Sequence, residues 1–147
     1  MASFSLQARV SAPVQTVFDV LADHRGYARI TPLRSSTLER EGVPAPNGVG
    51  AVRVLALAGP PIREQVTEFK PPSRLAYRAL SGVPAKHHQG LVELREVGDQ
   101  TFVNWRLDST PRLPLPESIY SALVKVAIRP LLRGIAKESE RRTQGTA

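Results

Sequence analysis

The sequence predicts an α+β protein in which a curved antiparallel sheet of about seven strands wraps around a long C-terminal α-helix, with two short helices after strand 1. Three observations support this fold class. The end of the chain has helical periodicity, the middle alternates like strands between turns rich in Gly and Pro, and a first strand precedes short helical segments. Short connections predict antiparallel neighbours, and one long helix can cover one face of such a sheet.

The C-terminal helix is predicted from Leu115 to about Arg142. At about 100° per residue, its apolar residues gather on one face, which we expect to contact the sheet. Pro130 removes a backbone donor inside this helix and should bend it. Ala127 and Gly134 are small, which leaves room for a cavity or for close backbone approach. The predicted inward face consists of Tyr120, Leu123, Val124, Ala127, Ile128, Leu131, Gly134 and Ile135.

The N-terminal region is predicted to form one strand and two short helices. Apolar residues alternate with polar ones from Phe4 to Val10, the pattern of a strand with one face inward. Helical spacing follows from Val14 to about Ala22, and Tyr27 to Ile30 can make one further turn. Thr31-Pro32 ends that turn, because the residue before proline disfavours the helical conformation.

Six further strands are predicted in the middle of the chain, each bounded by Gly, Pro, Asn or Asp. The clearest hairpin turns at Gly98-Asp99. The predicted strands are Ser35–Glu41, Ala51–Leu57, Ile62–Phe69, Arg74–Ser81, His87–Val97 and Thr101–Asp108.

Composition indicates one ordinary globular domain spanning residues 1–147. The chain is 41% hydrophobic and 22% charged, and it contains no cysteine, which excludes disulfides and thiolate metal sites. No signal-like segment or apolar run of membrane-spanning length occurs, so we expect a cytoplasmic protein, monomeric or homodimeric.

The net charge of +7 comes from 20 basic residues against 13 acidic ones. The basic residues are interspersed with acidic ones, and few aromatics accompany them, so nucleic-acid binding is not expected. The basic face of the last helix could contact an anionic membrane surface, but a solvated helix face has the same composition, and we expect the latter.

The order of elements and several short motifs resemble the START-like (SRPBCC, Bet v 1-like) superfamily of helix-grip proteins, and within it the polyketide cyclase/dehydrase branch. The resemblance covers nearly the whole chain. The motifs are Val10-Ser-Ala-Pro13 with Val17-Phe18, Gly48-Val-Gly50, Pro72 with Leu75-Ala-Tyr77, Gly90-Leu-Val-Glu-Leu94 and Val103-Asn-Trp105.

This resemblance implies an apolar cavity between the sheet and the last helix, holding a lipid, a polyketide or an aromatic compound. Strand alternation also places Arg53 with Leu55, and Glu64 with Ile62. If Arg53 and Glu64 both faced inward they could pair or hold a ligand's polar group, although an outward pair is commoner. The candidate ligand-binding residues are Tyr27, Arg53, Glu64, Tyr77, His88, Val103, Trp105, Tyr120, Leu123, Ala127 and Leu131.

His88 and Tyr77 are the candidates for catalysis, since an imidazole can act as a general acid or base near neutral pH. His87 and His88 point to opposite faces of one strand, so a metal site is not expected. No phosphate-binding loop or dinucleotide motif occurs, so no cofactor is expected. The main functional prediction is binding of a small hydrophobic molecule. A polyketide cyclase or aromatase using cavity Tyr, His or Arg is the alternative, and a ligand-responsive protein-interaction module is the second alternative.

Overall fold

A computed structural model describes residues 2–57 and 59–144 of the chain. The described residues follow the predicted order of elements. They form seven strands, two short α-helices, one 3-10 turn and one long α-helix. Among the described residues, no helix is both long enough and apolar enough to cross a membrane. The elements are β1 (Ala2–Val10), α1 (Val14–Ala22), η1 (His24–Gly26), α2 (Tyr27–Ile30), β2 (Ser35–Arg40), β3 (Val52–Ala56), β4 (Ile62–Lys70), β5 (Arg74–Ser81), β6 (Ala85–Val97), β7 (Gln100–Pro111) and α3 (Glu117–Gln144).

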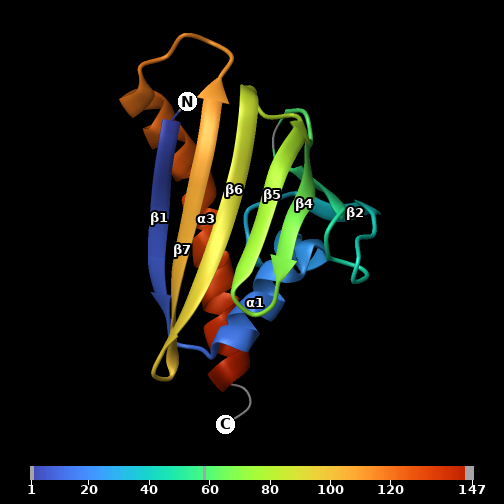
Figure 1. Cartoon of the computed structure of the whole chain (residues 1–147), viewed down its shortest axis with the longest axis vertical. Helices are drawn as coiled ribbons and strands as arrows, with labels where there is room; N and C mark the ends of the chain where they lie inside the picture. The colour runs from blue at the N-terminus through green and yellow to red at the C-terminus, as the bar shows by residue number, and fades with distance from the viewer. Residues whose placement is uncertain (1, 58, 145–147) are drawn as a thin grey trace.

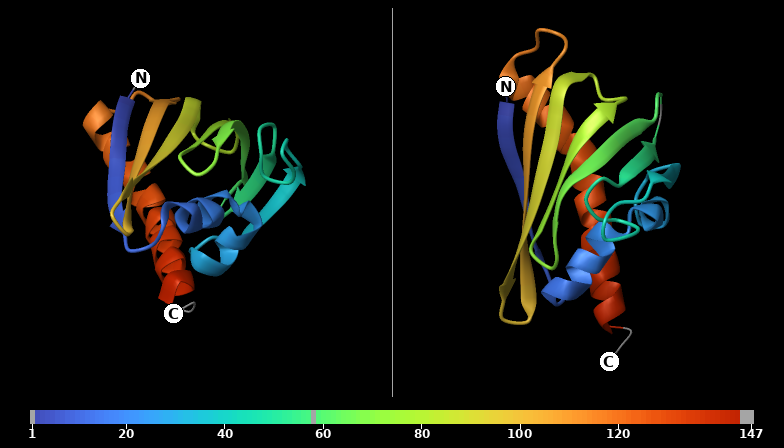
Figure 2. Two further views of the ribbon diagram at one scale, coloured as in Figure 1. Left: turned by 60° about the horizontal axis from the view of Figure 1, so that its bottom comes forward. Right: turned by 45° about the vertical axis from the view of Figure 1, so that its right-hand side comes forward.

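All seven strands form one antiparallel sheet, which confirms the predicted fold class. The strand order is β1-β7-β6-β5-β4-β3-β2, so the first and second strands lie at opposite edges. The sheet curves, and α3 runs along its inner side with α1 and α2 closing the lower part (Figures 1 and 2). The element boundaries agree with the predicted ones to within a few residues, because turn residues mark nearly every strand end.

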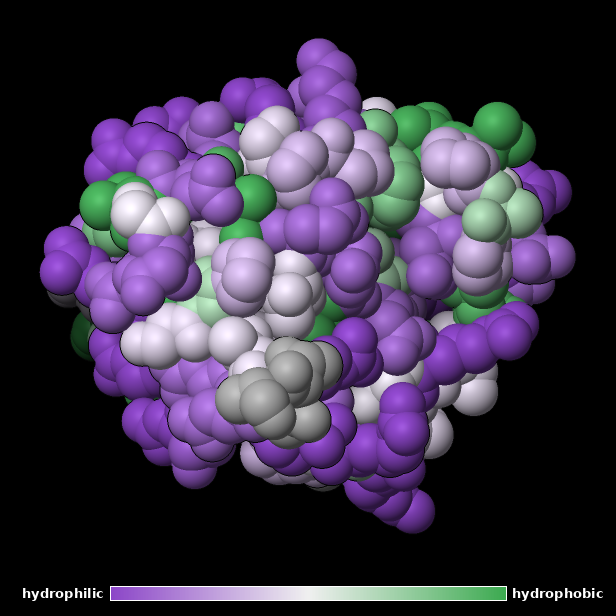
Figure 3. All heavy atoms as spheres, turned by 90° about the horizontal axis from the view of Figure 1, so that it is seen from below, coloured by the Kyte–Doolittle hydropathy of each residue, from purple (hydrophilic) through white to green (hydrophobic). Residues whose placement is uncertain are grey.

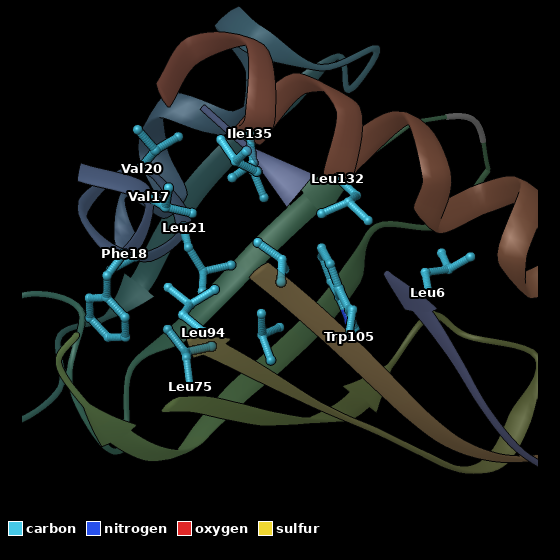
Figure 4. Packing of buried hydrophobic residues seen from close by; sticks show 14 of the residues in the cluster. Leu6, Val17, Phe18, Val20, Leu21, Leu75, Leu94, Trp105, Leu132 and Ile135 are labelled. Carbon is cyan, nitrogen blue, oxygen red and sulfur yellow. The ribbon is translucent and has the colours of Figure 1, made fainter. Parts of the chain in front are cut away.

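The hydrophobic core lies between the sheet, α1 and the second half of α3. Figure 4 shows Trp105 of β7 pointing toward α3 near Leu132, while Phe18 and Leu21 of α1 face the strands on the other side. The rings of Phe18 and Phe69 meet edge to face at 5.3 Å between centroids. Helix α3 therefore covers the β1 and β7 side of the sheet, and α1 covers the middle.

The predicted inward face of α3 is partly wrong. Leu123 is 57% exposed and Ala127 is also exposed, whereas Val124 and Ile128 pack against the core. Neighbouring helical positions differ by about 100°, so a modest rotation of the helix moves Leu123 out of the contact. The core side of α3 is instead formed by Tyr120, Val124, Ile128, Leu132 and Ile135.

Gly134 serves close backbone approach between two helices. A Cβ built at Gly134 would lie 2.1 Å from the carbonyl oxygen of Ile30 at the end of α2. Only glycine lets α3 approach α2 this closely. Of the two predicted explanations for this small residue, a cavity and a backbone contact, the structure shows the contact.

Candidate functional site

An ion pair lies on the inner side of the sheet. Arg53 on β3 and Glu64 on β4 are directly opposite in the antiparallel register, and their side chains are only 3% and 9% exposed. Arg53 Nε donates to Glu64 Oε1 at 3.0 Å, and its second terminal nitrogen lies 2.8 Å from the same oxygen. Burial lowers the pKa of Arg53, but the charge of Glu64 and the nearby tyrosines more than offset this, so the pKa is raised. Arg53 and Glu64 therefore form a pair that faces inward, and not the outward-facing pair that is commoner.

His24 extends this pair from the 3-10 turn η1. Its Nδ1 lies 2.8 Å from Arg53 Nη1. A guanidinium nitrogen can only donate, so Nδ1 carries no proton and Nε2 does. Burial, and then the charge of Arg53, hold the pKa of His24 well below its ordinary value of 6.5. His24 is thus a buried, neutral imidazole.

Tyr77 on β5 lies against the other side of Arg53. The guanidinium carbon of Arg53 is 4.6 Å from the centre of the Tyr77 ring, a cation–π contact. Trp105 Nε1 donates to the Tyr77 hydroxyl at 3.0 Å. Gly90 on β6 lies beside Tyr77, and a Cβ there would come within 2.4 Å of the ring. The tyrosine ring therefore occupies the space that a larger residue at position 90 would take.

The Tyr77 hydroxyl accepts a hydrogen bond but has no acceptor for its own proton among the described residues. Burial raises the pKa of Tyr77, so the phenol keeps that proton. His24 is similar, because the neighbour of its protonated Nε2 is the same Arg53 nitrogen at 3.4 Å, which cannot accept. Two buried donors therefore remain able to bind an acceptor oxygen.

Tyr27 completes the group, which we call the Arg53 cluster (His24, Tyr27, Arg53, Glu64 and Tyr77). The Tyr27 hydroxyl donates to the backbone carbonyl of Leu21, and its ring meets that of His24 edge to face at 5.7 Å. Burial raises its pKa to about 12. Tyr27 therefore braces the cluster and has no proton to offer a ligand.

His88 belongs to a separate hydrogen-bonded group. Its Nδ1 lies 2.9 Å from Ser109 Oγ, which in turn lies 2.6 Å from the hydroxyl of Tyr120 on α3. This chain joins β6, β7 and the first turn of α3. Within the described residues, no hydrogen bond or ring contact links His88 to Tyr77. His88 lies two residues before Gly90, the register partner of Tyr77, so both side chains face the same side of the sheet from adjacent strands. Burial lowers the pKa of His88.

The other predicted site residues divide between core and surface. Val103 and Trp105 are buried in the core, and Leu131 is half-buried against it. Leu123 and Ala127 are exposed, so they do not line a closed interior. In the described part of the chain, no three His, Asp or Glu side chains are grouped as metal ligands are.

Sequence reasoning missed His24 and Ser109. His24 lies in a short turn without hydrophobic periodicity, so nothing in the local pattern marked it as buried. Ser109 continues the alternation of Val103, Trp105 and Leu107 on β7, and extending the predicted strand by one residue would have found it.

The lowered pKa of the buried His24 should make the free energy of unfolding depend on pH. Because the folded pKa of His24 lies below its ordinary value, the unfolded chain binds a proton more readily. The contribution of His24 to the free energy of unfolding is therefore fully present at neutral pH, and it falls as the pH drops below 6.5. His24 alone should lower the free energy of unfolding by roughly 1 kcal/mol between pH 6.5 and about pH 5.5. Urea unfolding of the wild type and His24→Gln across this range measures the difference, and parallel slopes for the two proteins would contradict it.

We compared the chain with protein-family profiles, curated protein sequences and solved structures. A family profile described as "Polyketide cyclase / dehydrase and lipid transport" matches residues 1–140. A comparison with curated protein sequences finds no match. Among solved structures, a START superfamily protein from Mycobacterium smegmatis is similar, with a TM-score of 0.80 and 15% identity over 96% of this chain and 99% of that one.

Two solved structures described as aromatase/cyclases are also similar. The Zhui aromatase/cyclase from a Streptomyces species has a TM-score of 0.72 and 22% identity over 96% of this chain and 94% of that one. The di-domain ARO/CYC StfQ of the steffimycin biosynthetic pathway has a TM-score of 0.80 and 12% identity over 97% of this chain and 52% of that one. At these identities the likeness establishes a common fold.

Proposed function

We propose that this chain, which belongs to the polyketide cyclase/dehydrase and lipid transport family, binds one small, mainly apolar molecule between its curved sheet and α3. The observation that carries the proposal is the Tyr77 hydroxyl. It is buried within the Arg53 cluster, it is held by Trp105, and its proton has no acceptor among the described residues. A buried donor without an acceptor is costly, and a ligand oxygen would relieve that cost.

Exposed residues on one side of α3 support a route by which a ligand could reach Tyr77. Positions 123 and 127 lie eleven and seven residues before Gly134, so all three lie on one side of the helix. Gly134 on this side contacts Ile30, whereas Leu123 and Ala127 are exposed. The helix is therefore closed against α2 near its end and uncovered nearer its start.

Apolar residues of the sheet would border the same ligand route to Tyr77. Leu57 follows β3 on the face of Arg53 by alternation and is exposed, and Ile62 on β4 is half-exposed on the face of Glu64. The proposed ligand places its apolar body between these residues and Leu123, and its oxygen at Tyr77. This chemistry fits a lipid, a polyketide or an aromatic compound with one carbonyl or hydroxyl group.

Affinities of two probes test this assignment. A medium-chain methyl ketone offers one acceptor oxygen, and the hydrocarbon with the same number of carbons offers none. Trp105 is the chain's one tryptophan and reports binding through its fluorescence. Tyr77→Phe should weaken ketone binding about two- to tenfold and leave hydrocarbon binding unchanged, because one neutral hydrogen bond is lost.

Tyr120→Phe is the matched control, since it removes a buried hydroxyl that contacts Ser109 and lies outside the Arg53 cluster. It should leave both affinities at the wild-type level. Equal losses for ketone and hydrocarbon in Tyr77→Phe would count against a ligand oxygen at Tyr77.

Cyclase activity is the second candidate function, and the state of His88 favours it. The lowered pKa keeps this imidazole neutral at neutral pH, the form that can accept a proton from a ketone's neighbouring carbon. Tyr77 would polarise the ketone. A titration with a short poly-β-keto analogue separates the two functions, because a carrier returns the analogue unchanged and a cyclase returns a cyclised product.

A further inference from the structure

Exposed apolar side chains concentrate at one end of the molecule. Of the ten large hydrophobic residues that are exposed in the described part of the chain, five lie between positions 113 and 126. They belong to the connection after β7 and to the first half of α3, at the end opposite α1 in Figure 1. The opposite end, seen from below in Figure 3, is mainly hydrophilic. The five residues are Leu113, Leu115, Ile119, Leu123 and Val126, with exposed fractions of 40% to 68%.

The solvent side of α3 changes character along its length. Ile119, Ala122 and Val126 are spaced three and four residues apart, and all are exposed, so they form one outward stripe. The same spacing continues this stripe into a basic part. That part consists of Arg129, Arg133 and Lys137, all exposed. We call these three cations together with the five apolar residues the α3 docking face.

The charge on and around this face is mainly positive. Residues 112–137 contain five basic side chains and one acidic side chain, Glu117. Lys86 and Arg112 line a hollow of about 330 Å³ beside the connection, together with Leu113 and Tyr120. Apolar side chains are thus flanked by cations on both sides.

We propose that the α3 docking face binds the surface of an anionic lipid bilayer. At the boundary between headgroups and acyl chains, a bilayer accepts exposed apolar side chains, while anionic headgroups attract the neighbouring Lys and Arg. A second copy of the chain fits less well, because a symmetric contact would bring two strongly basic surfaces together. This surface was expected from sequence to be an ordinary solvated helix face, and the exposed apolar stripe is what the sequence reasoning did not foresee.

The inference does not depend on the proposed ligand. Leu123 is shared with the proposed ligand path, but the α3 residues changed in the tests below lie on the outer side of this helix, whereas the Arg53 cluster lies on the inner side of the sheet. Binding to vesicles can therefore be measured whether or not the interior takes up a molecule.

Flotation of the full chain with vesicles tests the proposal. We expect binding to vesicles of phosphatidylcholine with phosphatidylserine, little binding to phosphatidylcholine alone, and release by added salt. The double variant Arg129→Gln/Arg133→Gln should weaken binding by about tenfold or more. Ile119→Ser/Val126→Ser should also weaken it by about tenfold, because it removes the inserted apolar groups.

Matched controls change the same residue types elsewhere. Arg9→Gln/Arg106→Gln alters net charge equally at exposed positions of β1 and β7, and Val43→Ser/Val97→Ser removes exposed apolar groups away from α3. Both controls should bind vesicles like the wild type. Failure of the folded wild type to bind phosphatidylserine vesicles would overturn the proposal, as would equal losses in the controls. A dimer in solution that Ile119→Ser/Val126→Ser dissociates, without vesicle binding, would assign the face to a second copy instead.

Discussion

Glu64→Met should lower the free energy of unfolding by about 3 to 5 kcal/mol. The substitution keeps a similar side-chain volume but removes the anion that faces Arg53, whose side chain is 3% exposed. The guanidinium then remains buried and charged beside His24 and the Tyr77 ring, without its paired carboxylate. Losing one partner of a buried pair costs far more than the net worth of the pair, because the remaining charge has been removed from water. Urea unfolding followed by circular dichroism measures the loss.

The matched control is Glu39→Met. Glu39 pairs with Arg63 through two hydrogen bonds of 2.9 and 2.7 Å, so the geometry resembles that of the buried pair, but both side chains are well exposed. Water screens such a pair, and its loss should change stability little. The double variant Arg53→Met/Glu64→Met should recover much of the loss seen with Glu64→Met. An effect of Glu64→Met no larger than that of Glu39→Met would show that the pair is effectively solvated.

Gly134→Leu should destabilise the protein by at least about 1 to 3 kcal/mol through overpacking. Its Cβ would lie 2.1 Å from the Ile30 carbonyl oxygen and 3.1 Å from a methyl carbon of Thr31, so α3 and α2 must separate. Leucine is a better helix former than glycine by roughly 1 kcal/mol, which opposes the loss but does not exceed it. Thermal unfolding by circular dichroism measures the outcome.

Ala127→Leu is the companion variant, since it enlarges a small residue on the same side of α3 at an exposed position. Its stability should stay close to that of the wild type. If Ala127→Leu were as destabilising as Gly134→Leu, the predicted inward face of α3 would be correct and the rotated one wrong.

Strand alternation predicted most of the inner wall correctly. Val103, Trp105 and Leu107 share the inward side of β7, and Tyr77 lies on the inward side of β5, as their spacing indicated. Alternation also placed Arg53 with Leu55, but it cannot by itself show that a charged residue is buried. That result depends on Glu64 in the neighbouring strand and on His24, which a turn far away in the sequence brings to the pair.

The rotation of α3 could not be predicted, because its first half is apolar on almost every side. Ile119, Leu123, Val124 and Val126 are all hydrophobic, so periodicity alone does not select one face. The choice is made by contacts that only the fold supplies. Tyr120 reaches Ser109 on β7, and Gly134 lies against Ile30, and together these contacts fix which side of the helix meets the sheet.

The number of molecules bound per folded chain tests the central claim most directly. Native mass spectrometry of the protein titrated with the medium-chain methyl ketone reads that number, and Trp105 fluorescence shows whether the site saturates. The proposed function predicts one molecule per chain, with saturable binding by the wild type and weaker binding by Tyr77→Phe. A folded chain that retains no ketone and shows no saturable fluorescence change would contradict binding between the sheet and α3.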